Sequence, residues 1–517
     1  MKPTDPSDKF PAHEAASVGA IDAPPPNAND TAKGLGTTVV KGAVWTSLAN
    51  VARIASAVLI IPILTRFLDL EDFGIMQIAM PIVLFLMIFN DAGLGPALVR
   101  AKAPSRQMWS SVLWTNLALG VAMTGGLFLA ADFFANFFRE PEVRPIIQAL
   151  SVALILNCLC IVPGAWLQRK YKFKEMTIVE VVSIWCGITA AIVSAAMFNA
   201  GAWALVYQQI AMFTVKTAML WTYARKVDVR FEYSFREIAD VFGFSSSLLG
   251  TRFITFITQN APNMIIGRLL GSAALGAYSI AYRIMIVPIQ IFAYGLTSVL
   301  LPTMSQFHED TARMKAACLR TYRLIALITF PAMAGIVALA EPIVLFTLGE
   351  KMAAAGTVLP WLAPVGAIQS LLSSQGAMYM ALGRADILLK WATIEMVLVT
   401  IGFSVSIQYG LIASVQAYLI VFMLICLPSL NALLRLIDAS LGDLARALWQ
   451  PVLISVIMAV VVRGMWSAEI TYIPTDLFAR LMSFVAIGAG LYIIGLVLID
   501  RPAFGEFHKI AKAVLSR

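Results

Sequence analysis

The stretch Ile265–Ser305, IIGRLLGSAALGAYSIAYRIMIVPIQIFAYGLTSVLLPTMS, indicates how the rest of the chain is organised. It predicts the end of one apolar helix, a short turn of small residues, and a second apolar helix that carries Arg283 inside its hydrophobic length. The stretch also has a gapless counterpart 202 residues earlier. The matching pairs are Arg268 with Arg66, Gly276 with Gly74, Ile280 with Ile78, Ala281 with Ala79, Gly295 with Gly93, and Leu296 with Leu94.

A fixed offset held over this distance predicts an internal duplication. Two apolar segments match at Leu, Ile and Ala by coincidence, so those pairs carry little weight. The arginine pair and the two glycine pairs in the same register favour duplication over coincidence.

The composition excludes an ordinary globular enzyme. Of the 517 residues, 59% are hydrophobic and 13% are charged, whereas globular proteins carry about 25% charged residues. The apolar runs are long and continuous and do not alternate in short segments, which indicates membrane-spanning helices and not a β-barrel. The sequence therefore predicts an all-α polytopic membrane protein.

Fourteen spans are expected from the apolar runs. They cover residues 40–66, 74–98, 109–131, 145–168, 176–198, 202–224, 239–266, 272–300, 320–348, 355–380, 386–408, 411–434, 446–466 and 479–499. The 202-residue offset places the first two spans on the seventh and eighth. Six spans separate the copies, so both halves have the same orientation, as in the parallel type of transporter repeat.

This pattern predicts six segments. They are a disordered cytosolic tail (1–37), an N-lobe of six spans (38–224), a cytosolic linker (225–238), a C-lobe of six spans (239–435), two further spans (436–500) and a cytosolic tail (501–517).

Basic residues set the expected orientation. Loops after even-numbered spans carry eighteen Lys and Arg residues, whereas loops after odd-numbered spans carry five. The positive-inside rule places the richer loops, and with them both termini, in the cytosol. The net charge of +8 is spread over these short loops, so it indicates topology and not a nucleic-acid partner.

Three arginines lie too deep in the expected spans for comfortable snorkelling, about 15 Å from either end at 1.5 Å per residue. They are Arg53, Arg252 and Arg283. Charge within a span is costly and usually marks a transport pathway.

Polar residues extend each arginine into a stripe at helical spacing. We expect these stripes to line one cavity between the halves. The lining set is Arg53, Arg252, Arg283, Asn50, Thr255, Gln259, Tyr282 and Gln290. Arginine matches phosphate oxygens, while amide, hydroxyl and aromatic groups suit sugars, so the pattern indicates an anionic, polar, lipid-tethered cargo.

Two acidic residues, Asp91 and Glu395, leave an alternative open. They either form internal ion pairs with the arginines or take part in proton or cation coupling. The sequence holds no P-loop and no soluble catalytic constellation, and Cys158 and Cys160 lack metal-ligand spacing. We therefore expect neither an enzyme nor a cofactor nor a metal site.

Several loose motifs together resemble a known family. They are Asn263-Met-Ile-Ile-Gly-Arg-Leu-Leu-Gly, Leu275-Gly-Ala-Tyr-Ser-Ile-Ala-Tyr-Arg, Pro288 and Leu300-Leu-Pro-Thr-Met-Ser-Gln, with Leu70-Glu-Asp-Phe-Gly and Asp91-Ala-Gly-Leu in the first half. From about residue 38 to 500 the chain resembles the polysaccharide transporter family, the Wzx-type flippases of the MOP superfamily. Within it, the pattern is most similar to colanic-acid, succinoglycan and xanthan exporters.

The resemblance implies fourteen helices in a bacterial inner membrane and flipping of undecaprenyl-diphosphate-linked oligosaccharide to the periplasmic face. It implies that cavity arginines hold the diphosphate, with Arg53 and Arg283 the nearest matches, followed by Arg252. The implied partners are the lipid-linked oligosaccharide, membrane lipid, and a polysaccharide polymerase with its export machinery.

Three other functions stay open at this point. A multidrug or cation antiporter of the same superfamily would use cavity carboxylates, so Asp91 and Glu395 favour it, while the three arginines argue against it. A flippase for the lipid-linked peptidoglycan precursor matches these loops less well. A scaffold for a polymerase complex would not need polar stripes inside its spans.

Overall fold

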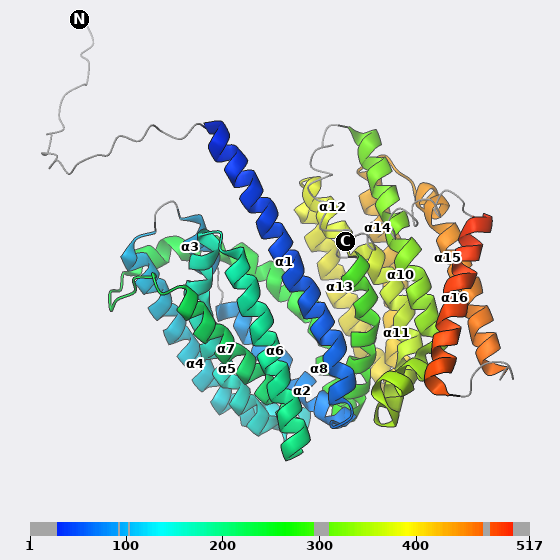
Figure 1. Ribbon diagram of the computed structural model, residues 1–517, viewed down its shortest axis with the longest axis horizontal. Coiled ribbons are helices and arrows are strands. Elements are labelled where there is room, and N and C mark those ends of the chain that lie inside the picture. Colours follow the sequence, from blue (N-terminus) through cyan, green and yellow to red (C-terminus); the bar gives the residue numbers. More distant parts are fainter. Residues whose placement is uncertain (1–27, 91–93, 102–103, 294–309, 469–475, 500–517) are drawn as a thin grey trace, which may run out of the picture.

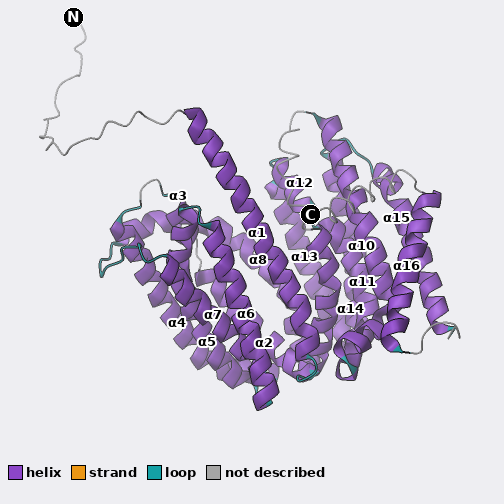
Figure 2. Ribbon diagram, in the orientation of Figure 1, coloured by secondary structure: helices purple, strands orange, loops and turns teal. Residues whose placement is uncertain are grey.

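The structure is a computed structural model that describes residues 28–90, 94–101, 104–293, 310–468 and 476–499, with the backbone alone at 28–44, 90 and 236–252. Every regular element within these ranges is a helix (Figure 2). The expected all-α class is thus confirmed.

The first half of the chain forms seven helices. These are α1 (Ala28–Leu64), α2 (Leu70–Asn90), α3 (Leu94–Arg100), α4 (Arg106–Phe138), α5 (Val143–Arg169), α6 (Phe173–Phe198) and α7 (Trp203–Tyr223). The second half begins with the long helix α8 (Phe235–Pro288) and the π-helical turn η1 (Ile289–Ala293). It continues through α10 (Thr311–Leu348), η2 (Glu350–Met352), α11 (Ala353–Leu372), α12 (Gln375–Ala381), α13 (Ala385–Ser406), η3 (Ile407–Tyr409) and α14 (Leu411–Arg435), and the last two helices are α15 (Leu441–Ser467) and α16 (Leu477–Ile499).

Twelve helical stretches of the described chain are long and apolar enough to cross a membrane. Two differences separate this number from the fourteen expected spans. The helix α7 falls outside the twelve, although it has 21 residues. The seventh and eighth expected spans are counted as one because α8 is continuous by its hydrogen bonds.

Gly271 divides α8 into two parts that correspond to those two spans. Its φ of 84° and ψ of 179° are not helical, and a positive φ of this size favours glycine because it has no Cβ. We call Phe235–Leu270 the first part of α8 and Ser272–Pro288 the second part. The turn expected from the small residues of this stretch therefore takes the form of a sharp kink.

Prolines inside the helices free carbonyl groups that side chains of other helices then bind. Proline has no N–H to give to the carbonyl four residues earlier, and an unpaired carbonyl is costly in lipid. Ahead of Pro163 in α5, the carbonyl of Leu159 accepts from Trp221 Nε1 at 3.0 Å. Ahead of Pro342 in α10, the carbonyl of Ala338 accepts from Arg463 Nη1 at 3.4 Å.

The helices form two bundles with α1 and α8 between them (Figure 1). One bundle holds α2 to α7, and the other holds α10 to α16. The bundles meet at the lower end of Figure 1, where α2 packs against α8, and diverge toward the upper end. The first part of α8 also lies along α2, since Phe85 contacts Phe253 and Phe256 at ring centroid distances of 5.9 and 5.4 Å.

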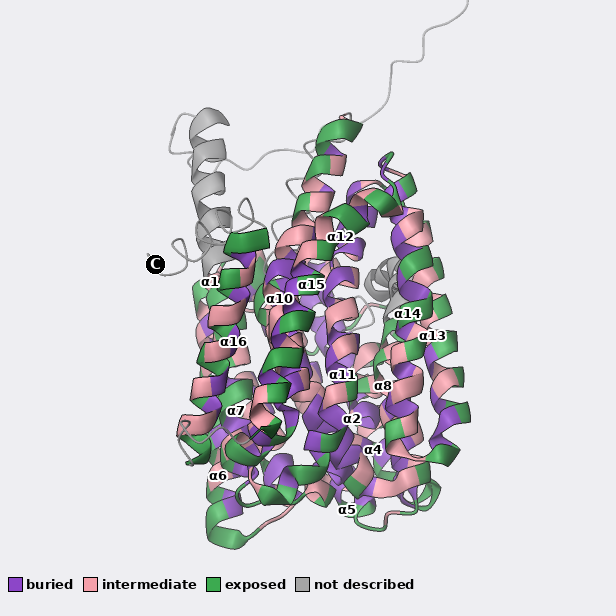
Figure 3. Cartoon of the chain, turned by 90° about the vertical axis from the view of Figure 1, so that its right-hand side faces the viewer, coloured by how far each residue is buried: buried purple, intermediate pink, exposed green. Residues whose placement is uncertain are grey.

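Burial follows the bundles, with buried residues facing inward and exposed residues on the outer faces (Figure 3). The exposed positions include large apolar side chains such as Leu129 at 81%, Phe198 at 74% and Leu498 at 74%. Such faces are stable only against lipid or a partner. Together with the twelve apolar stretches they show a multi-pass membrane protein.

Two expected boundaries need correction. We expected a disordered tail through residue 37, but α1 begins at Ala28. The apolar pattern begins only near residue 40, so it cannot detect a helix whose first turns are polar. The linker expected at 225–238 ends at Ser234, where α8 begins, and Phe231 of the linker stacks on Trp114 of α4.

Candidate functional site

The polar stripe on α1 is exposed and internally bonded. Arg53 Nη2 donates to Asn50 Oδ1 at 2.9 Å, one helical turn away, and both side chains are exposed. The amide thereby orients the guanidinium along the helix without neutralising its charge. The helix itself is tied to the first bundle where Thr177 of α6 donates to the carbonyl of Trp45 at 3.0 Å.

The stripe on the first part of α8 is exposed as well. Thr255 and Gln259 lie one turn apart and both are exposed. Arg252 continues the same face by helical spacing, and its side chain lies outside the described atoms. The two exposed stripes therefore come from α1 and α8, the helices that lie between the bundles (Figure 1).

Arg283 lies in the second part of α8 and is half-buried. Within the described chain, its guanidinium forms no ion pair and no hydrogen bond. A charged group at this depth is costly unless a partner compensates it. Arg283 can thus accept an anionic ligand without first breaking a protein contact.

A second polar group surrounds Tyr418 of α14. The amide of Gln369 in α11 donates to the Tyr418 hydroxyl at 3.1 Å. Glu395 of α13 and Tyr282 of α8 lie within electrostatic range of Tyr418. Glu395 forms no ion pair with any arginine in the described ranges, so the coupling alternative for Glu395 stays a prediction.

The remaining predicted site residues lie outside the polar group around Tyr418. Gln290 is half-buried in the π-helical turn η1, directly after Pro288. Asp91 lies outside the described residues. The structure therefore brings Asn50 to Arg53, it places Tyr282 and Glu395 each near Tyr418, and it keeps Arg53 apart from any described carboxylate.

Sequence reasoning missed two polar contacts that join the halves at the lower end of Figure 1. Glu140, after α4, accepts from the backbone N–H of Ser272 at 3.0 Å and from its hydroxyl at 2.7 Å. Lys351, after α10, pairs with Asp69 at 2.8 Å. We call these two contacts the cross-lobe latches.

The latches follow the internal repeat. Asp69 directly precedes α2, and Gly271 directly precedes the second part of α8, so the offset of 202 relates these two positions, and Ser272 is the next residue. Each latch is closed by the loop of the opposite half. The 202-residue offset indicates which helix starts are equivalent. It does not indicate which loops contact those helix starts.

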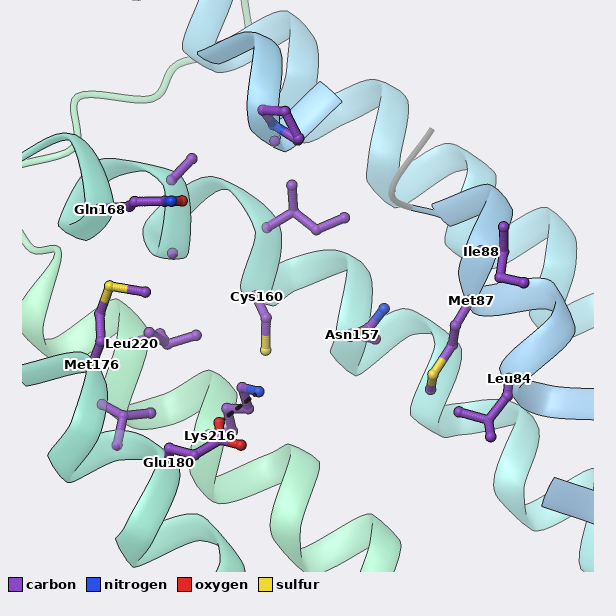
Figure 4. A pocket seen from close by; sticks show the side chains of 16 residues that line it. Leu84, Met87, Ile88, Asn157, Cys160, Gln168, Met176, Glu180, Lys216 and Leu220 are labelled. Carbon is purple, nitrogen blue, oxygen red and sulfur yellow. Dashed lines mark hydrogen bonds and ion pairs between the residues drawn. The ribbon is translucent and has the colours of Figure 1, made fainter. Parts of the chain in front are cut away.

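A cavity inside the first bundle was also missed (Figure 4). It has a volume of about 550 Å³ and lies among α2, α3, α5, α6 and α7. Lys216 Nζ of α7 contacts Glu180 Oε2 of α6 at 3.1 Å on its wall. Asn157 and Gln168 of α5 also line it. We call it the α5 pocket.

Comparison with protein families identifies one match. Residues 63–355 match the family described as polysaccharide biosynthesis protein.

Three relatives illustrate the similarity to individual proteins. The succinoglycan biosynthesis transport protein ExoT of Rhizobium meliloti is 27% identical over 92% of this chain and 96% of its own length. The teichuronic acid biosynthesis protein TuaB of Bacillus subtilis is 24% identical over 89% of this chain and 95% of its own. The lipopolysaccharide biosynthesis protein WzxC of Escherichia coli is 24% identical over 68% of this chain and 72% of its own.

Solved structures share the fold at low identity. The lipid II flippase MurJ in an inward closed conformation matches with a TM-score of 0.71 at 14% identity, over 90% of this chain and 99% of that one. An inward-facing multidrug transporter of the MATE family matches with a TM-score of 0.57 at 17% identity, over 76% of this chain and 96% of that one. The all-α fold expected from the sequence is therefore shared with these solved structures.

Proposed function

Because the chain belongs to the polysaccharide biosynthesis protein family, we propose that it flips lipid-linked oligosaccharide repeat units across the bacterial inner membrane for exopolysaccharide or lipopolysaccharide synthesis. The cargo would be an oligosaccharide on undecaprenyl diphosphate. The similarity to ExoT and WzxC, a succinoglycan biosynthesis transport protein and a lipopolysaccharide biosynthesis protein, supports this choice.

The observation that carries the proposal is the unpaired charge of Arg283. A half-buried guanidinium without a described protein partner suits an anion that binds and leaves. Arg53 and Arg252 would supply further charge for the diphosphate, and the exposed Asn50, Thr255 and Gln259 would supply hydrogen bonds for sugar hydroxyl groups.

The orientation is part of the proposal. The excess of basic residues in the even-numbered loops supports cytosolic termini, and the diverging end of the bundles would then face the cytosol and the latched end the periplasm. Cargo would enter between an N-lobe (38–224) and a C-lobe (239–435), and rocking of these lobes would expose it to the other side. We expect the polymerase and export machinery to receive it there.

Glu395 supports a second candidate function, a cation or drug antiporter. Its carboxylate is half-buried and forms no ion pair in the described chain, which is what a proton-coupled site needs. The three arginines favour an anionic cargo over a cationic drug.

Loss of the chain in its own host tests the proposal. Cells without it should accumulate undecaprenyl-linked repeat units that a membrane-impermeant glycan-oxidising reagent cannot reach from outside. Restoring the wild-type chain should restore both labelling and polymer. If the units are labelled equally with and without the chain, the flippase proposal is wrong, and drug sensitivity would then test the antiporter.

A further inference from the structure

The lining residues of the α5 pocket suit a neutral polar ligand. The single cation that lines it, Lys216, is matched by the single acid, Glu180, so the wall carries no net charge. Asn157 and Gln168 each offer a donor and an acceptor. Within the described chain neither side-chain amide is hydrogen-bonded to another protein group, so both are available to a ligand.

The volume fits a ligand larger than an ion. About 550 Å³ lies inside the range of small-molecule sites, roughly 300 to 1,000 Å³. A cation site needs several oxygen ligands at once, and the one carboxylate present is already paired with Lys216. A diphosphate would need unmatched positive charge, which Arg283 offers and this pocket does not.

Gly164 keeps the pocket open. A Cβ added at Gly164 would meet no atom within 4 Å, although the residue lies inside α5 and lines the cavity. The remaining floor is apolar, formed by side chains such as Leu84, Met87 and Ile161. This combination suits a sugar, because the free amides can hydrogen-bond to its hydroxyl groups and the apolar side chains can pack against its C–H faces.

The pocket lies toward the end at which the bundles diverge. It is lined by the last turns of α2 and the first turns of α6, with Met87 and Met176 as examples. The latches at Asp69 and Ser272 close the opposite end. The pocket therefore lies nearer to the proposed cytosolic side than to the latched end.

From these observations we propose that the α5 pocket binds sugar residues of the cargo while the arginines hold its diphosphate. The inference rests on the proposed function, because it assigns one part of the same lipid-linked substrate. It places one determinant of glycan choice inside the first bundle, in addition to the exposed polar residues that lie between the lobes.

Two kinds of variant test the assignment. Gly164→Leu adds a side chain to the pocket lining at a position where the new Cβ meets no atom within 4 Å, and Asn157→Leu with Gln168→Leu removes the free amides. Gly126→Leu in α4 is the matched control, since a Cβ there also meets no atom within 4 Å and the residue does not line the pocket. Each full-length protein is purified and titrated in native mass spectrometry.

The titration uses two lipids. One is the pool of undecaprenyl-diphosphate-linked glycans extracted from the host, and the other is undecaprenyl diphosphate without sugar. Both pocket variants should bind the glycan lipids about tenfold more weakly than wild type, since each neutral hydrogen bond contributes roughly threefold to fivefold. They should bind the sugar-free lipid as tightly as wild type, and Gly126→Leu should match wild type for both.

The outcomes separate the two proposals. Wild type that binds neither lipid contradicts the proposed function. Wild type that binds both, with pocket variants that bind glycan lipids equally well, overturns the glycan pocket alone. Equal weakening for both lipids would also overturn it, because the change would then act on the diphosphate or on the fold.

Discussion

Gly74 of α2 lies directly against the backbone of Ser272 in α8, so closely that an added Cβ would overlap the Ser272 carbonyl. The reciprocal contact places Gly276 of α8 against the carbonyl of Leu70 in α2. The offset of 202 residues exchanges these two contacts, since it maps Gly74 to Gly276 and Leu70 to Ser272. The two halves thus meet through equivalent residues, as a two-fold axis requires.

Adding one methyl group at this contact should open the latched end. Gly74→Ala or Gly276→Ala puts Cβ on a backbone carbonyl that cannot rotate away, and overpacking of this kind costs about 1–3 kcal/mol. We expect glycan export to fall by roughly tenfold at normal protein level. Gly125→Ala in α4 is the control, because a Cβ there meets no atom within 4 Å.

The opening itself can be measured at Leu68. This side chain is fully buried beside the contact, so Leu68→Cys in a background without the five native cysteines should react slowly with an impermeant maleimide. The alanine changes at Gly74 and Gly276 should speed this labelling. Unchanged labelling together with unchanged export would show that the glycine contact does not hold the end closed.

The two latches should contribute unequally. Glu140 accepts two hydrogen bonds at a helix start, and such charge-assisted bonds contribute about 1.5–3 kcal/mol. The Asp69–Lys351 pair is more than half exposed, and exposed pairs contribute only about 0.2–1 kcal/mol. Glu140→Gln should therefore speed Leu68→Cys labelling more than Asp69→Asn does.

Charge reversal provides the control for the weaker latch. Asp69→Lys should open the end, and adding Lys351→Asp should close it again because the pair re-forms in the opposite sense. Equal labelling of the single and double reversals would contradict a direct ion pair.

Loss of the guanidinium at Arg283 should impair export without loss of protein. Arg283→Gln removes charge-assisted hydrogen bonds to phosphate, so we expect export to fall about tenfold to a hundredfold. Arg53→Gln and Arg252→Gln should have smaller effects, since each supplies part of the same charge. The matched control is Arg446→Gln, whose side chain is 82% exposed at the start of α15.

Two results would count against the arginine assignment. Intact export in all three variants would contradict a phosphate-binding role. Loss of the protein from the membrane would instead indicate that the arginines stabilise the fold.

The orientation predicts the activity of reporter fusions. Alkaline phosphatase is active only outside the cytosol, so it should be inactive after Arg517 and active after Gly201, which lies between α6 and α7. The opposite pattern would reverse the proposed topology and the assignment of the latched end.

The sequence could predict the helices and the repeat because both leave local signals. Long apolar runs predict the membrane spans. The equivalent glycines Gly74 and Gly276 indicate a helix contact that leaves no room for a side chain. The small residues around Gly271 predict a turn, and the structure has a sharp kink at this position. The α5 pocket could not be predicted, because Asn157 and Lys216 lie on different helices and meet only through packing. For the same reason the sequence did not show that Glu140 reaches Ser272.

Translocation by the purified chain tests the central claim most directly. Proteoliposomes would carry fluorescent undecaprenyl-diphosphate-linked glycan and the double variant Asp69→Cys with Lys351→Cys, in a background without native cysteines. Thiol crosslinkers of graded length would join the two positions, whose native side chains meet at 2.8 Å. We predict rapid translocation before crosslinking, none after it, and recovery once the link is reduced. Equal translocation by crosslinked and reduced protein, or none in either, would contradict a flippase that works by opening its lobes at this end.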